Sequence, residues 1–201
     1  GSELFNKICE TDAYYQTRTE MSLLHQKANA IGDLLGNNRI ILEPGAGNMR
    51  KIRPLFKAVK PERYLGIDIS KQEVVKSSYG LAIDFPEILI FGIVGDFLHI
   101  DNDELSQLIP DASSRSVFFP GSTIGNFAPD QAQEFLAQTA MFVGNGGIGI
   151  FGIDLVKPSK ILNMAYNDPQ GFTRDFNLNL LTRLNREFGA NFDLKAFEHE
   201  A

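Results

Sequence analysis

Residues 39–51 read RIILEPGAGNMRK, a short apolar run followed by a turn that contains Gly45 and Gly47. The run Arg39–Leu42 predicts a buried β-strand. Glycines directly after a strand permit a tight turn, in which a ligand can approach the backbone closely and the amide groups of a following helix can face it. The third glycine of the dinucleotide-binding pattern is absent, because Arg50 occupies its position. The turn alone is therefore weak evidence for a ligand, and a purely structural turn is the alternative.

The segments on either side of this turn alternate between β-rich apolar runs and stretches of helical periodicity. Further strands are predicted over 64–69, 88–94, 116–119 and 148–153, and helices over 17–35, 70–85 and 129–143. Five strands in this alternation predict an α/β fold with a doubly wound, mainly parallel sheet of the Rossmann-like kind. In such sheets ligands bind beyond the carboxyl ends of the strands, so the residues after each strand are the candidate site.

Two of the predicted helices begin with a capping-box pattern, Thr17 with Glu20 and Ser70 with Glu73. The apolar positions that recur at helical spacing behind the first box are Met21, Leu24, Ala28, Ile31, Leu34 and Leu35. The acidic stretch 101–104, DNDE, predicts the solvated start of another helix. The residues after 157 predict a polar helical segment with interspersed aromatic residues.

The composition is that of an ordinary globular domain and excludes several classes of protein. The chain has 201 residues, of which 43% are hydrophobic and 22% charged, which argues against disorder, collagen and coiled coil. A formal net charge of −6 weighs against a generic binder of nucleic acid or anionic membranes. A single cysteine, Cys9, cannot form an intramolecular disulfide. We find no signal-peptide pattern and no run long enough to span a membrane, so we expect a soluble, cytoplasmic protein.

Two aspartates lie at or just after the ends of the second and third predicted strands. Asp68 lies 23 residues after Gly45, where a carboxylate can accept both hydroxyls of an adenosine ribose in NAD- and SAM-dependent enzymes alike (SAM, S-adenosylmethionine). Asp96 could accept the adenine amino group while Phe97 packs on the base. Glu43, two residues before the first glycine, fits the E-x-G-x-G pattern of many SAM-dependent enzymes. Together these residues favour a methyltransferase, and an NAD-dependent oxidoreductase is the alternative from another class.

The polar segment after the fourth predicted strand ends in Asn126, whose amide could hold a carboxylate or an amine. A loop residue that only satisfies backbone groups is the alternative. His99 and His199 have no cysteine or carboxylate partner at metal-binding spacing, so we expect no metal site. The basic run 50–63 indicates a solvated helix face, although Lys51 is close enough to the glycine turn to reach a ligand carboxylate.

Two longer segments resemble a known family. Residues 10–20, ETDAYYQTRTE, and residues 119–127, FPGSTIGNF, resemble elements of the histidine-specific N-alpha-methyltransferases, the SAM-dependent enzymes of ergothioneine synthesis. Segments similar to further elements of the family follow in the family's order, namely DLVKP at 154–158, AYND at 165–168, FNLNLL at 176–181 and RLN at 183–185. The resemblance covers essentially the whole chain.

The resemblance implies a class I SAM-methyltransferase fold, SAM as cofactor and a small amino-acid substrate, with no nucleic-acid or membrane partner and with a monomer favoured. The SAM-binding positions of the family correspond to Gly45, Lys51, Asp68, Asp96 and Phe97. Its substrate-binding positions correspond to Tyr14, Asn126 and Tyr166. The implied reaction transfers three methyl groups to the alpha-amine of histidine and gives the betaine hercynine.

The resemblance also implies a division of the chain. Residues 1–38 would be a helical segment on the substrate side, 39–156 the SAM-binding core, and 157–201 the start of a substrate domain that the chain does not complete. Because the family extends beyond both ends of the match, we expect a core cut at both ends, which lacks the side chains that grip the imidazole. Two alternatives therefore stay open: an N-methyltransferase of the same family acting on another amine, such as a tryptophan derivative, and a SAM-binding core that is inactive in this form.

Overall fold

The structure is a computed structural model that describes residues 1–100, 105, 107–109 and 114–201. The predicted helix start at 101–104 lies outside the described residues. The chain groups into two compact units, one of Glu20–Asp154 and one of Gly1–Thr19 with Leu155–Ala201. Within the described residues, no helix combines the length and the apolarity that a membrane crossing requires.

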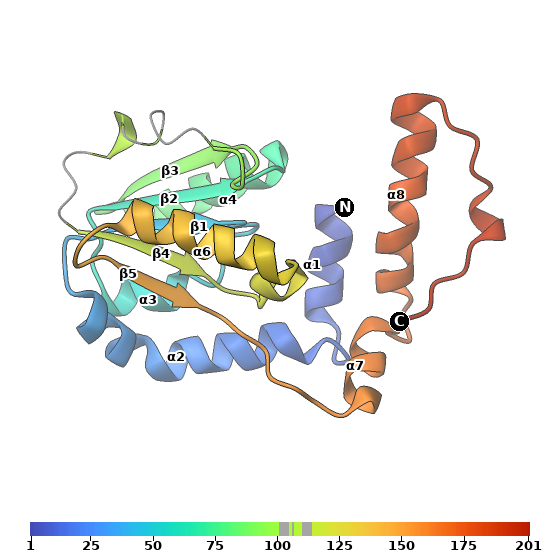
Figure 1. Ribbon diagram of the computed structural model, residues 1–201, viewed down its shortest axis with the longest axis horizontal. Helices are drawn as coiled ribbons and strands as arrows, with labels where there is room; N and C mark the ends of the chain where they lie inside the picture. The colour runs from blue at the N-terminus through green and yellow to red at the C-terminus, as the bar shows by residue number, and fades with distance from the viewer. Residues whose placement is uncertain (101–104, 106, 110–113) are drawn as a thin grey trace. The chain divides into compact units, whose positions relative to one another are not determined.

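The unit Glu20–Asp154 is built around a five-stranded sheet with the strand order β3-β2-β1-β4-β5 (Figure 1). The strands are β1 (Ile40–Pro44), β2 (Arg63–Asp68), β3 (Leu89–Val94), β4 (Arg115–Phe119) and β5 (Ile148–Phe151). Every adjacent pair is parallel. Within the sheet, the chain enters at the central strand β1, continues outward through β2 to β3 at one edge, and then crosses to β4 and β5. This reversal of direction beside β1 is the switch point of a doubly wound sheet, and it confirms the predicted fold class.

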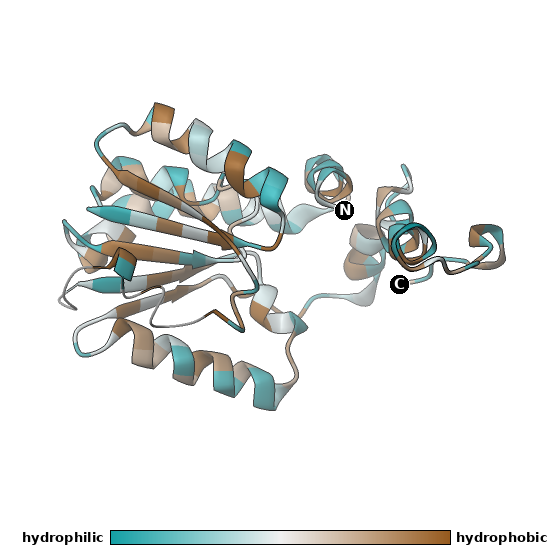
Figure 2. Cartoon of the chain, turned by 90° about the horizontal axis from the view of Figure 1, so that it is seen from above, coloured by the Kyte–Doolittle hydropathy of each residue, from teal (hydrophilic) through white to brown (hydrophobic). Residues whose placement is uncertain are grey.

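Helices cover both faces of this sheet (Figure 1). They are α2 (Tyr15–Leu35), α3 (Arg53–Ala58) and α4 (Lys71–Asp84) on one face and α6 (Pro129–Val143) on the other. Alternate strand residues point to opposite faces, so Ile41 and Tyr64 pack with α2, α3 and α4, whereas Leu42 and Leu65 pack with α6. Figure 2 shows this as hydrophobic residues along the strands between helices with hydrophilic outer faces.

Helix α2 begins earlier than the capping-box pattern at Thr17 predicts. It starts at Tyr15, so Thr17 lies inside the helix and the predicted cap is wrong. The turn before the helix is closed by other groups: the N–H of Tyr14 donates to Oγ1 of Thr11, and the guanidinium of Arg18 donates to the carbonyl oxygen of Thr11 at 2.7 Å. Because these bonds shape the preceding turn, they fix the start of the helix upstream of the local pattern.

One strand boundary and the burial of one residue also differ from the predictions, each for a physical reason. Strand β5 ends at Phe151 rather than at residue 153, because its partner β4 ends at Phe119, the residue paired with Phe151. Leu34 was predicted on the buried face of α2 but is 74% exposed. The buried stripe of that helix runs through Leu24, Ala28, Gly32 and Leu35, and Leu34 lies about 100° around the helix from Leu35.

The unit formed by Gly1–Thr19 and Leu155–Ala201 is helical. It contains α1 (Ser2–Glu10), the start of α2, α7 (Ser159–Tyr166), α8 (Phe172–Phe188) and the short 3-10 helix η2 (Leu194–Ala196). Helix α1 packs on α8, where the rings of Phe5 and Phe176 lie 6.1 Å apart. Asp168 accepts hydrogen bonds from the N–H groups of Phe172 and Thr173, both at 2.8 Å, and so satisfies the first turn of α8.

Candidate functional site

The turn after β1 has the backbone that its glycines permit. Gly45 and Gly47 have φ of +65° and +51°, a region that residues with a side chain rarely adopt. A Cβ atom at Gly45 would lie 3.6 Å from Cε1 of Phe97. The absence of a side chain at position 45 therefore leaves bare backbone next to an aromatic ring.

Asp68, at the end of β2, is bonded to this turn. Its Oδ2 accepts a hydrogen bond from the N–H of Gly47 at 3.0 Å, and its Oδ1 accepts one from the N–H of Ser70 at 2.9 Å. Each carboxylate oxygen can accept about two hydrogen bonds. The structure thus brings the turn and Asp68 together, and each carboxylate oxygen of Asp68 keeps the capacity to accept a further donor.

Asp96 follows β3, the next strand outward. Its Oδ2 lies 2.9 Å from Nδ1 of His99, and its Oδ1 accepts a hydrogen bond from the N–H of Leu98. The hydrogen bond with His99, and then that from Leu98, lower the pKa of Asp96. Its side chain is 49% exposed. Asp96 is therefore an ionised acceptor at neutral pH, accessible at the carboxyl end of the sheet.

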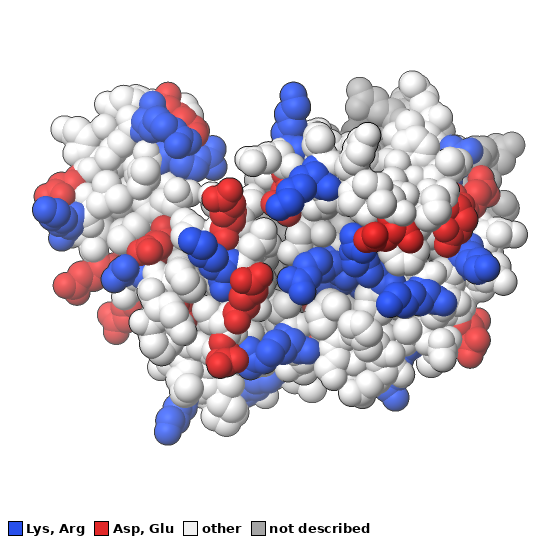
Figure 3. Space-filling view, turned by 180° about the vertical axis from the view of Figure 1, so that it is seen from behind, with Lys and Arg blue, Asp and Glu red and all other residues white. Residues whose placement is uncertain are grey.

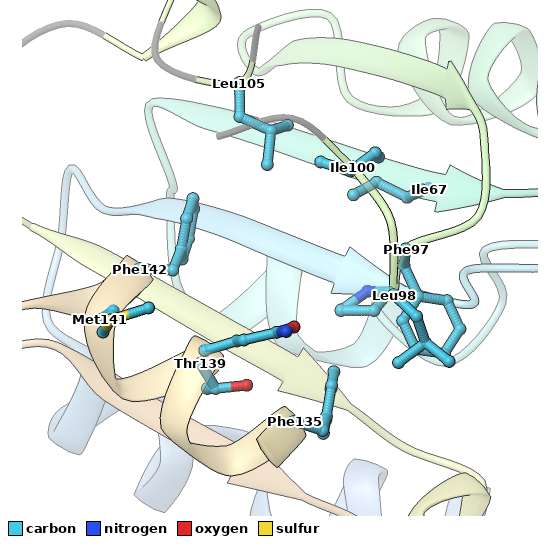
Figure 4. Close-up of a pocket in the computed structure, with 11 residues that line it drawn as sticks. Ile67, Phe97, Leu98, Ile100, Leu105, Phe135, Thr139, Met141 and Phe142 are labelled. Carbon is cyan, nitrogen blue, oxygen red and sulfur yellow. The ribbon is translucent and has the colours of Figure 1, made fainter. Parts of the chain in front are cut away.

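Phe97 forms part of the wall of a cavity of about 190 Å³. Figure 4 shows the cavity between the ends of the strands, the segment after β3 and helix α6, with Ile67 and Phe135 among the apolar side chains around it. Gln138 and Thr139 add polar groups from α6. An apolar wall with a few polar groups is typical of small-molecule sites, so Phe97 stands where a flat ring could pack.

Glu43, the acidic residue of the E-x-G-x-G pattern, is buried. It is 2% exposed, and its Oε2 accepts a 2.6 Å hydrogen bond from the hydroxyl of Tyr64. Burial raises the pKa of Glu43 to about 8, against the lowering effects of Tyr64 and Lys51. Glu43 is thus part of the interior under the turn.

Lys51 is held by Glu20, a residue that was not predicted to belong to the site. Its Nζ lies 2.7 Å from Oε2 of Glu20, and Oε1 of the same carboxylate accepts a hydrogen bond from the N–H of Gly121 at 2.7 Å. Glu20 belonged to two sequence patterns, the capping box at Thr17 and the family-like segment 10–20, and neither indicated a contact with Lys51. A bond to a residue 101 positions away gives no local signal in the sequence.

Two further residues of the basic run have acidic partners. Arg53 is paired with Asp84, and Arg63 with Glu62. On the face of the chain in Figure 3, acidic and basic side chains are interspersed. Arg50, Lys57 and Lys60 are exposed, which fits the solvated face predicted for this run.

Asn126 ends a short 3-10 helix, η1 (Thr123–Asn126), after β4, and it is exposed. The segment is anchored at its start, where Oγ of Ser122 accepts a 2.9 Å hydrogen bond from the N–H of Asp154. Asn126 therefore stands on an ordered segment beyond the carboxyl end of β4.

Tyr14 and Tyr166 belong to the other unit, where the structure brings them together. Their ring centroids are 6.0 Å apart in an edge-to-face arrangement. The Tyr166 hydroxyl accepts a 3.1 Å hydrogen bond from Nε2 of Gln16, and Tyr166 is 40% exposed. Among the residues that the structure describes, no group of three or more His, Cys, Asp or Glu side chains could hold a metal ion.

Comparison with known proteins gives a match over the whole chain. A family model described as "Histidine-specific methyltransferase, SAM-dependent" matches residues 1–201. The histidine N-alpha-methyltransferase of Mycolicibacterium smegmatis is 36% identical over 205 residues, which cover 100% of this chain and 62% of that protein. The ergothioneine biosynthesis protein 1 of Neurospora crassa is 27% identical, over 94% of this chain and 22% of that protein. The 4-dimethylallyltryptophan N-methyltransferase of Aspergillus fumigatus is 26% identical, over 100% of this chain and 61% of that protein. The chain thus spans at most 62% of the length of these relatives.

Proposed function

We propose, since the chain belongs to the family of histidine-specific, SAM-dependent methyltransferases, that it is the cofactor-binding part of an enzyme that methylates the alpha-amine of histidine to give hercynine. One observation carries the proposal beyond family membership. The glycine turn, Asp68 and the Asp96–Phe97 pair follow three adjacent parallel strands, β1, β2 and β3, within one compact unit. A nucleoside-containing ligand bound at the carboxyl ends of such strands would meet all three.

The side chains in this unit fit SAM, and we propose residues 39–156 as its binding core. The bare backbone at Gly45 allows close approach of the ligand, and Asp68 has acceptor capacity left for ribose hydroxyls. Asp96 can accept the adenine amino group while Phe97 packs on the base. Lys51 would bind the carboxylate of the methionine part. When bound, SAM supplies a methyl group that is activated by its attachment to a sulfonium.

We propose that Tyr14, Asn126 and Tyr166 bind the amino-acid substrate. The Asn126 amide can donate to a carboxylate or accept from an amine. The Tyr166 hydroxyl already accepts from Gln16, so its own proton is available for a ligand acceptor. These residues would orient the amine, and partial desolvation would favour its neutral, nucleophilic form. No strong base is needed, because water can take the proton that the amine releases.

A second candidate is an N-methyltransferase of the same family that acts on another amine. The similarity to a 4-dimethylallyltryptophan N-methyltransferase over the whole chain favours it. The description of the family and the higher identity to the mycobacterial relative favour histidine.

Calorimetric titration with S-adenosylhomocysteine, with NAD in parallel, tests the cofactor proposal. We expect micromolar binding of S-adenosylhomocysteine and no binding of NAD. Binding of NAD alone, or of neither ligand by a chain that melts cooperatively, would contradict the proposal. Incubation with SAM and either histidine or a tryptophan derivative, followed by mass spectrometry of the amines, then separates the two substrate candidates.

A further inference from the structure

We propose that Glu20 is a positioning residue for carboxylate recognition: its side chain fixes Lys51 and the backbone N–H of Gly121 at the carboxyl ends of β1 and β4. The inference rests on the proposed function, because it takes Lys51 as the group that binds the carboxylate of the methionine part of SAM. It adds a residue for which no sequence pattern suggested a role at the site.

Both oxygens of the Glu20 carboxylate are engaged, each with a different loop. Oε2 is 2.7 Å from Nζ of Lys51, in the segment after β1, and Oε1 accepts a hydrogen bond from the N–H of Gly121, two residues after the end of β4. The side chains of Glu20 and Lys51 are 18% and 24% exposed. Because water is largely kept from the pair, its attraction is stronger than that of an exposed surface pair.

Two glycines leave the space that this ion pair fills. A Cβ atom at Gly152, just after β5, would collide with Oε1 of Glu20. A Cβ atom at Gly121 would lie 2.9 Å from Nζ of Lys51. The backbone of Gly152 has no positive φ, so space and not conformation requires a glycine there. The ends of β1, β4 and β5 are thus shaped around the Glu20 carboxylate.

This arrangement prepares Lys51 for a ligand. A lysine side chain has four flexible carbons and loses much conformational freedom when it binds. Held by Glu20, Lys51 has lost part of that freedom before the ligand arrives, so less binding energy is spent on ordering it. The same carboxylate fixes Gly121, near the start of the segment that leads from β4 to Asn126.

The test compares a ligand that has a carboxylate with one that lacks it. S-adenosylhomocysteine and adenosine share the nucleoside, but only the former carries the amino-acid end. Both are titrated calorimetrically into the wild-type chain, Glu20→Gln, Glu20→Ala and Glu134→Gln; Glu134 lies on the exposed face of α6, and its substitution makes the same charge change. We expect Glu20→Gln to lower affinity for S-adenosylhomocysteine about tenfold and to leave adenosine affinity unchanged. Glu134→Gln should change neither affinity.

Equal weakening of both ligands by Glu20→Gln would assign Glu20 a merely structural role and overturn the inference. Unchanged binding of S-adenosylhomocysteine would also overturn it. Tighter binding would overturn it as well, because it would mean that Glu20 competes with the ligand for Lys51. If the wild-type chain binds S-adenosylhomocysteine and Glu20→Gln has no selective effect, only the inference fails. If the folded wild-type chain binds neither ligand, the proposed function fails as well.

A second variant, Gly152→Ala, tests the same carboxylate by filling the space that it occupies. In Gly152→Ala the new methyl group must displace Glu20, so we expect a loss of S-adenosylhomocysteine affinity similar to that of Glu20→Ala. In the double variant the two losses should not add, because the displaced group is already absent. A folded Gly152→Ala chain that binds S-adenosylhomocysteine as tightly as the wild type would contradict the inference, because Glu20 would have moved from Lys51 without effect. Cooperative melting of each variant confirms that it is folded.

Discussion

The hydroxyl of Tyr64 on β2 donates a 2.6 Å hydrogen bond to Oε2 of Glu43 on β1, and both side chains are buried. Burial raises the pKa of Glu43 to about 8. Burial and the adjacent Glu43 also raise the pKa of Tyr64 well above its usual value, so the phenol keeps its proton. The two central strands therefore enclose a carboxyl group that stays protonated at a pH where an exposed one is ionised.

We predict that Glu43 makes the unfolding free energy fall between about pH 4.5 and about pH 8. The folded chain keeps the Glu43 proton over this range while the unfolded chain has released it, so stability present at low pH is lost as pH rises through the folded pKa. The slope from one such group is at most ~1.4 kcal/mol per pH unit. In Glu43→Gln, which cannot titrate, this contribution disappears.

Urea unfolding of the wild-type chain and of Glu43→Gln at about pH 5.5 and about pH 7.5 measures this difference. The stability of the variant relative to the wild type should rise with pH. The exposed substitution Glu134→Gln serves as the control for the charge change. Parallel pH profiles for Glu43→Gln and the wild type would contradict the prediction.

Alanine at Gly45 should impair cofactor binding, whereas alanine at Gly36 should not. The two glycines have similar φ, +65° and +70°, so each substitution should cost about 1 kcal/mol of backbone strain. At Gly36 the added Cβ meets no atom within 4 Å, whereas at Gly45 it faces Phe97 across the bare turn. Urea unfolding should show similar losses of stability, and only Gly45→Ala should weaken binding of S-adenosylhomocysteine. Equal affinity in both variants would place the ligand away from this turn.

Asp96→Ala and Asn126→Ala should separate the cofactor from the substrate. Asp96 is an ionised acceptor after β3, so its loss should lower the affinity for S-adenosylhomocysteine about tenfold. Asn126 lies on η1 after β4, and its loss should leave the affinity for S-adenosylhomocysteine unchanged and lower the affinity for histidine. Calorimetry with S-adenosylhomocysteine, followed by histidine added to the preformed complex, measures both affinities. If neither substitution changes S-adenosylhomocysteine affinity, the cofactor assignment is wrong.

The fold class and the family were predictable because their signals are local. Ile40, Ile41 and Leu42 of β1 are all buried, and a strand buried on both faces shows such a continuous apolar run. Residues 10–20 and 119–127 indicated the family, and the match over residues 1–201 confirms it. The order of apolar runs and helical stretches was enough to predict the doubly wound sheet.

Glu20 shows what could not be predicted. Its spacing from Thr17 fits a capping box, yet its carboxylate bonds to Gly121 and pairs with Lys51. Contacts between strand ends that are far apart in the sequence arise only when the sheet assembles. The burial of Glu43 is similar: the E-x-G-x-G pattern identifies the acid, but only the neighbouring strand supplies Tyr64 as its partner.

Asp168→Ala should destabilise helix α8 without affecting the cofactor. Asp168 is 6% exposed and accepts the N–H groups of Phe172 and Thr173 at 2.8 Å, so its loss leaves two donors in the first turn of the helix without their acceptor. We expect a cost of about 1–2 kcal/mol, seen as faster hydrogen exchange in α8 and a lower urea midpoint. Asp175→Ala is the matched control, because Asp175 lies in the first turn of α8 but is 46% exposed and pairs with Arg174. It should cost less than about 0.5 kcal/mol. Equal effects of the two substitutions would mean that charge near the helix start, and not the pair of hydrogen bonds to Asp168, stabilises α8.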